Sequence, residues 1–205
     1  MMMSATNETG TEGNFGVHPK KFMLWLGMAS ITMFFAVTTS ALLVKKGDQQ
    51  YWMNFELPKI FMVSTLVVVA SSAAMQAALN AFRKERFSLY RKLLTAASVS
   101  GVLFLIMQYV GWNAMQSMGI FLDGNASGSF IYVLSGAHGL HIVGGLIALL
   151  IAMYKAHRAR RDPLFEIKHI LNPKQVLSLE ILTTYWHFVN IVWVYLFVFF
   201  YFNYQ

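Results

Sequence analysis

Residues 183–202 read TTYWHFVNIVWVYLFVFFYF and decide the fold of this 205-residue chain. The stretch carries no charge and has the length of about 20 residues that an α-helix needs to cross about 30 Å of hydrocarbon. It nevertheless places His187 and Asn190 among apolar residues. A polar side chain within a membrane is costly unless a neighbouring helix supplies its hydrogen-bond partner. The stretch therefore predicts a helical bundle in which these two side chains face inward.

The composition agrees with a membrane protein. Hydrophobic residues make up 57% of the chain and charged residues only 12%, outside the usual range of a soluble domain. The chain has no cysteine, which excludes disulfides, thiolate zinc sites, iron–sulfur clusters and the attachment of c-type haem. Any redox centre held by this chain would have to use histidine.

Four more long apolar runs precede residues 183–202 in the chain. Together they predict an all-α, polytopic bundle of five transmembrane helices over residues 22–44, 60–82, 93–122, 130–154 and 175–204. Residues 1–19 are polar and lack periodicity, so we expect a disordered cytoplasmic tail ahead of a single transmembrane domain over 20–205. Asn172 and Pro173 form a typical N-cap and first helical residue for the last helix.

The distribution of basic residues predicts the orientation. With the N-terminus in the cytoplasm and the C-terminus outside, the inner segments hold 13 of the 16 Lys and Arg residues, as the positive-inside rule requires. The net charge of +7 is thereby explained by topology, with anionic lipid headgroups as a second attraction. We therefore expect a multi-pass protein of the cell (inner) membrane and no nucleic-acid partner.

Small residues mark two predicted packing faces. Ala70, Ala74 and Ala78 recur at four-residue spacing in the second helix, and such a stripe lets two backbones approach closely in a bilayer. In the fourth helix, glycines surround two histidines, and they predict close packing there as well; they are Gly136, Gly139 and Gly144.

The fourth helix is also the expected partner of His187 and Asn190. His138 and His141 are three residues apart and share one helical face, and counting from the helix ends puts them at a depth similar to His187. Trp186 directly precedes His187 in the sequence and is expected in the same network. We expect a polar network that joins the fourth helix to the fifth.

Three interpretations of these histidines compete. Paired histidines on facing helices ligate b-type haem in membrane bundles, and imidazoles also relay protons. A relay of that kind usually includes a carboxylate within the membrane, and the only acidic residue in a predicted helix, Glu180, is expected at the inner surface. The favoured interpretation is a structural network, or one facing a lipid or partner subunit, because neutral imidazole and amide groups both donate and accept. It predicts no catalytic group and no bound metal in this chain.

Two motifs resemble the subunit III family of haem-copper terminal oxidases. The segment Y-W-H-F-V-N-I-V-W at 185–193 resembles the family's Y-W-H-F-V-D-V-V-W, and G-A-H-G-L-H-I at 136–142 resembles G-F-H-G-L-H-V. Weaker similarity lies at Ser30-Ile31-Thr32-Met33-Phe34-Phe35, which is similar to S-E-x-M-F-F, and at 108–112, which is similar to Q-x-x-E-Y or Q-x-x-E-W. The likeness covers residue 20 to the C-terminus and fits the family's five-helix form.

The resemblance implies an accessory subunit that binds no haem or copper itself. The catalytic subunit I would carry those cofactors, reduce oxygen and pump protons. The family also implies bound phospholipid, support for proton uptake, further oxidase subunits as partners and contact with an upstream respiratory complex. The electron donor, cytochrome c or a quinol, is left open.

The chain departs from the family at three positions. Where the family motifs carry carboxylates, this sequence has Ile31, Gly111 and Asn190. Any part that those carboxylates take in proton collection should be missing here. Two rivals from other classes are a self-standing b-type membrane cytochrome and a transporter, and the inverted repeats and broken helices typical of a transporter are not evident.

Overall fold

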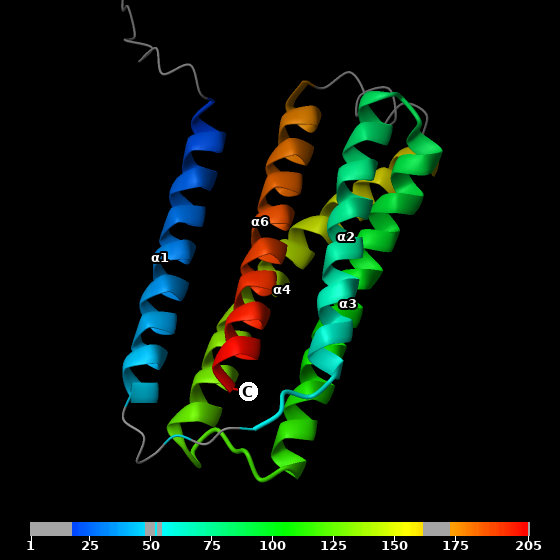
Figure 1. The fold of residues 1–205 in the computed structure, drawn as a ribbon. Coiled ribbons are helices and arrows are strands. Elements are labelled where there is room, and N and C mark those ends of the chain that lie inside the picture. The colour runs from blue at the N-terminus through cyan, green and yellow to red at the C-terminus, as the bar shows by residue number, and fades with distance from the viewer. Residues whose placement is uncertain (1–17, 48–51, 53–54, 162–172, 205) are drawn as a thin grey trace, which may run out of the picture.

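The fold is an antiparallel bundle of long helices (Figure 1). The structure, a computed structural model, describes residues 18–47, 52, 55–161 and 173–204. Within that part of the chain there are five helices and no β-strand. The helices are α1 (Pro19–Gly47), α2 (Ile60–Arg83), α3 (Phe87–Ser117), α4 (Ala126–Arg161) and α6 (Pro173–Tyr204). Each is long and apolar enough to cross a membrane, which confirms the predicted all-α membrane bundle.

The helices are offset from the uncharged runs that predicted them. α4 extends to Arg161 beyond the predicted residue 154, and α3 begins at Phe87 instead of residue 93, because helices continue through charged residues where they leave the hydrocarbon. α4 also begins four residues earlier than predicted, at Ala126. α3 stops at Ser117, ahead of Gly119, whose φ of +79° is a conformation that glycine adopts without strain. Of the predicted tail at 1–19, residues 1–17 lie outside the described residues and Pro19 begins α1; the predicted cap residue Asn172 also lies outside them.

The two ends of the bundle are held by different polar contacts. At one end, called here the Glu180 end, the Glu180 carboxylate accepts hydrogen bonds from Lys21 of α1 and Arg83 of α2, both at 2.8 Å. At the other, the Tyr204 end, the Tyr204 hydroxyl donates to the Ser127 carbonyl at 2.6 Å. His18 and Tyr204, the first and last described residues, lie at opposite ends (Figure 1).

α2 and α3 form a close antiparallel pair. Ala78 is fully buried in a core cluster that also contains Ala97 of α3, and Ala74 packs against this cluster. The Ser71 hydroxyl donates to the Ala97 carbonyl at 3.3 Å, a contact that only closely packed backbones allow. Ala70, predicted as part of the same stripe, is exposed.

α6 lies against α1, α2 and α4 and fills the centre of the bundle. Its buried aromatic and aliphatic side chains recur every seven residues, the spacing of a left-handed helix seam; they are Leu179, Trp186, Trp193 and Phe200. Trp186 is 1% exposed, and its ring lies against a glycine on each of two neighbouring helices. A Cβ on Gly101 of α3 would lie 2.9 Å from the ring, and one on Gly145 of α4 would lie 3.3 Å from it.

The glycines predicted as packing residues are not the ones that contact Trp186. A Cβ on Gly139 or Gly144 would meet nothing within 4 Å, and one on Gly136 would make only an ordinary contact with Trp112 at 3.9 Å. The motif identified the correct helix. It could not show which glycine faces the indole, because neighbouring glycines differ by about 100° around the helix.

The substitution Gly145→Ala should destabilise the protein, because the new Cβ would lie 2.8 Å from Tyr185 Cε1 and 3.3 Å from the Trp186 ring. We expect a cost of about 1–3 kcal/mol, typical of overpacking. The matched control is Gly144→Ala, whose Cβ meets open space. Thermal unfolding of both variants in detergent measures the difference, and equal melting temperatures would contradict the packing described above.

Candidate functional site

His187 bonds to α2 through both ring nitrogens. Its Nε2 lies 3.0 Å from Gln76 Oε1, and its Nδ1 is hydrogen-bonded to the Ser72 hydroxyl. Because an amide oxygen only accepts, Nε2 carries a proton, and in a neutral imidazole Nδ1 then accepts from Ser72. His187 thereby joins α6 to α2 through two hydrogen bonds.

Asn190 also bonds to α2. Its Nδ2 donates to the Val68 carbonyl at 3.4 Å. Its Oδ1 is buried and has no hydrogen-bond partner among the described residues. Asn190 is therefore a second polar link between the same two helices.

The tryptophans of α6 complete the junction. Trp186 Nε1 donates to the Ser71 hydroxyl and Trp193 Nε1 donates to the Thr65 hydroxyl, each at 3.0 Å. An indole N–H within a membrane needs such an acceptor. Serine and threonine on α2 supply it without a formal charge.

The α4 histidines lie in another environment. His138 is 0% exposed, and aromatic rings from three helices surround it, those of Phe35, Phe104 and Trp193, at centroid distances of 6.2, 5.8 and 5.3 Å. Neither ring nitrogen has a hydrogen-bond partner within the described part of the chain. His141 Nδ1 bonds to the Ala137 carbonyl of its own helix at 2.7 Å.

The predicted network between α4 and α6 is therefore not the one observed. Within the described residues, no hydrogen bond joins His138 or His141 to His187 or Asn190. His187 points to α2, whereas the His138 ring packs against Trp193, six residues further along and about 120° around α6. One hydrogen bond does join α4 to α6, from the Tyr185 hydroxyl to the His141 carbonyl at 3.0 Å.

Sequence reasoning missed the α2 side chains that complete this junction. Thr65, Ser71, Ser72 and Gln76 are small or neutral polar residues of a kind that often bond only to their own helix. The available signal was the pair of tryptophans seven residues apart, each of which requires an acceptor at a matching level of the neighbouring antiparallel helix. Histidine has more varied chemistry than these residues, and for that reason the two α4 histidines were the predicted partners of His187.

The described part of the chain has no evident metal-binding site. No group of three or more His, Asp or Glu side chains there is placed to hold an ion. The three membrane histidines are divided between two environments, one polar and one aromatic.

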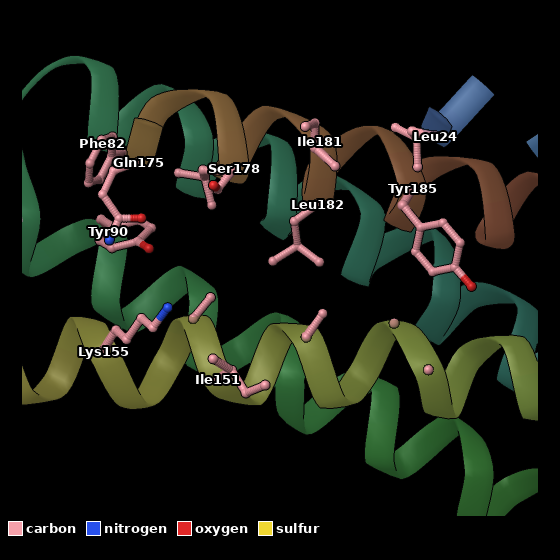
Figure 2. Close-up of a pocket in the computed structure, with 15 residues that line it drawn as sticks. Leu24, Phe82, Tyr90, Ile151, Lys155, Gln175, Ser178, Ile181, Leu182 and Tyr185 are labelled. Carbon is pink, nitrogen blue, oxygen red and sulfur yellow. The ribbon is translucent and has the colours of Figure 1, made fainter. Parts of the chain in front are cut away.

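A groove of about 490 Å³ lies between α4 and α6 (Figure 2). Small residues on α4 leave the space for it, namely Gly144, Gly145, Ala148 and Ala152. Figure 2 shows Lys155 and Gln175 at one end of the groove and Tyr185 at the other, with Ile151 and Leu182 between them. Gly144, predicted as a packing residue, thus borders a groove.

Comparison with known proteins gives the family. The model of the family described as cytochrome c oxidase subunit III matches residues 17–204. This chain belongs to the cytochrome c oxidase subunit III family. The resemblance inferred from the two motifs is thereby confirmed.

Individual relatives carry two kinds of oxidase name. The probable cytochrome c oxidase subunit 3 of Mycobacterium tuberculosis strain H37Rv is 31% identical over 140 residues, which are 67% of this chain and 63% of that protein, so this match spans less than two thirds of the relative's length. The cytochrome bo(3) ubiquinol oxidase subunit 3 of Buchnera aphidicola is 26% identical over 99% of this chain and 98% of that protein. The cytochrome c oxidase subunit 3 of Synechocystis is 25% identical over 96% of this chain and 82% of that protein.

The three departures from the family motifs have local structural consequences. A Cβ on Gly111 would lie 2.8 Å from the Phe61 ring, so a glutamate there would require that ring to move. Ile31 packs against the apolar core. The Asn190 amide donates to a backbone carbonyl, which an ionised aspartate cannot do.

Replacing His187 with Leu should weaken the contact between α2 and α6 by about 0.6–2 kcal/mol, the usual range for a hydrogen bond between membrane helices. His138→Leu should be neutral or stabilising, because it removes a buried group that has no partner among the described residues. Thermal unfolding of the two variants in detergent compares these effects. A larger loss of stability in His138→Leu than in His187→Leu would contradict the assignment.

Proposed function

We propose that this chain serves as subunit III of a respiratory haem-copper terminal oxidase in the cell membrane, most simply one that oxidises cytochrome c. The observation that carries the proposal is the family match over residues 17–204. Five helices able to span a membrane support it. Haem, copper and the reduction of oxygen would belong to partner subunits, above all catalytic subunit I.

The role we propose is mechanical support of the catalytic subunit. The polar side chains at the centre of α6 are used in helix–helix contacts: Trp186 and Trp193 bond to hydroxyls of α2, and both His187 nitrogens are engaged. Support for proton uptake would then be indirect, through a correctly held subunit I. Direct collection of protons by the family's carboxylates is not expected where this chain has Ile31, Gly111 and Asn190.

A quinol oxidase is the second candidate. A relative named as a ubiquinol oxidase subunit aligns with 99% of this chain. Because other subunits would select the electron donor, the structure of this chain fits a cytochrome c oxidase and a quinol oxidase equally well. A self-standing b-type cytochrome is less consistent with an imidazole whose two nitrogens already bond to Ser72 and Gln76.

The test is purification of the tagged chain from its own membranes in mild detergent. We expect it to co-purify with oxidase subunits, with a haem spectrum that does not change in His187→Leu. A copper-bearing subunit II would assign the cytochrome c type, and its absence the quinol type. A chain that purifies alone, or a haem band that this variant abolishes, would contradict the proposal.

We also propose that the α4–α6 groove holds a phospholipid. Acyl chains would lie along the apolar walls, and the phosphate would lie near Lys155 at the polar end, as expected at a membrane surface (Figure 2).

The substitution Ala148→Trp should fill the groove and remove one bound phospholipid from the purified complex. Ile147→Trp is the matched control, because Ile147 is exposed and is not among the groove residues. Native mass spectrometry counts the lipids retained. Equal counts in the two variants would contradict a lipid site in this groove.

A further inference from the structure

A line of polar side chains runs along the outward side of α2, next to α6. On α2, Ser72, Gln76 and Asn80 are spaced by four residues and so share one face. His187 of α6 lies between the first two. These four residues are called here the polar strip. Gln76 and Asn80 are exposed, and Ser72 and His187 are half-buried.

The hydrogen bonds of the polar strip run in one direction. Ser72 donates to His187, His187 donates to Gln76, and Gln76 Nε2 donates to Asn80 Oδ1 at 3.4 Å. His187 Nδ1, Gln76 Oε1 and Asn80 Oδ1 thus each accept a bond within the polar strip, and the line ends in the Asn80 amide N–H donors. Within the described residues, no hydrogen bond from the Asn80 amide nitrogen is found, and one N–H of Gln76 is also unused.

The depth of the polar strip decides what can meet these donors. Arg83 marks the end of α2, where it pairs with Glu180. Gln76 lies seven residues before Arg83 and His187 seven residues after Glu180, so both lie about 10 Å from this ion pair along their helices. At that depth lipid offers hydrocarbon, which cannot accept a hydrogen bond from Gln76, whereas Asn80, three residues before Arg83 and about 4.5 Å from the pair along α2, lies nearer the membrane surface.

Apolar side chains border the polar strip, as in a protein interface. Val69 is 52% exposed on α2 and Ile191 is 67% exposed on α6, and Ala73 is exposed between Val69 and Gln76. A polar centre with an apolar margin suits a second helix better than it suits acyl chains, because van der Waals packing and interhelical hydrogen bonds drive association in membranes.

From these contacts we propose that the polar strip is the docking surface for a transmembrane helix of another subunit. That helix would present hydrogen-bond acceptors, from Ser, Thr, Asn, Gln or a carboxyl group, at the level of Gln76 and Asn80. Lys21 and Arg83 share the single carboxylate of Glu180, and the net positive charge that remains favours an acidic acceptor at the surface end of the helix. This inference rests on the proposed role as a subunit of a complex.

The test is photocrosslinking in intact membranes that contain the full complex. A benzophenone amino acid replaces Ala73, which is exposed beside the polar strip, or, as a control, Ile106, which is exposed on α3. We expect position 73 to crosslink to a transmembrane peptide of another subunit. Capture of phospholipid alone at position 73 would overturn the inference, as would an equal yield of protein crosslinks at position 106.

A pair of variants provides a second measurement. Asn80→Leu should lower the amount of partner subunit recovered per tagged chain by about three- to tenfold, in line with the usual strength of interhelical hydrogen bonds. Gln116→Leu, at an exposed amide of α3, should leave recovery unchanged. Equal recovery in the two variants would overturn the inference. Haem that still co-purifies while position 73 captures only lipid would refute the docking surface and leave the proposed function intact.

Discussion

The contact on which the bundle depends is the seating of the Trp186 indole between two glycines. Its ring occupies the space that side chains on Gly101 and Gly145 would fill, and its N–H donates to Ser71. One side chain thereby fixes the distances of α3 and α4 from α6 and the rotation of α2 against α6. Because the hydrophobic effect does not hold helices together within lipid, such close fits and hydrogen bonds must do so.

The remaining polar contacts follow from this arrangement. Once Trp186 faces Ser71, the helical repeat brings Trp193 to Thr65 and Asn190 to the Val68 carbonyl. His187, one residue beyond Trp186, turns to the outer side of α2 and reaches Ser72 and Gln76. Neutral groups therefore align α2 and α6 through the interior of the bundle, the Arg83–Glu180 ion pair joins them at one end, and one polar surface is left for a partner.

The sequence predicted the fold better than the site. The number and type of helices follow from the length of each apolar run, which lipid thickness controls directly. The pairing of His187 did not follow, because a single sequence shows that a polar group needs a partner without showing which neighbouring helix provides it. Ser72 and Gln76 carry no distinctive signal of their own. The glycine motif identified α4 correctly, but only the rotation of that helix reveals that Gly145 contacts Trp186 and Gly144 borders the groove.

The natural absence of cysteine allows a direct measurement of which helix His187 faces. A double variant with Ser72→Cys and His187→Cys should be joined by a short thiol-reactive crosslinker in membranes, since the native side chains are in hydrogen-bond contact and the shorter cysteines leave only a small gap. The pair His138→Cys and His187→Cys should not. Crosslinking of the second pair but not of the first would show that α6 bonds to α4, and would contradict this account.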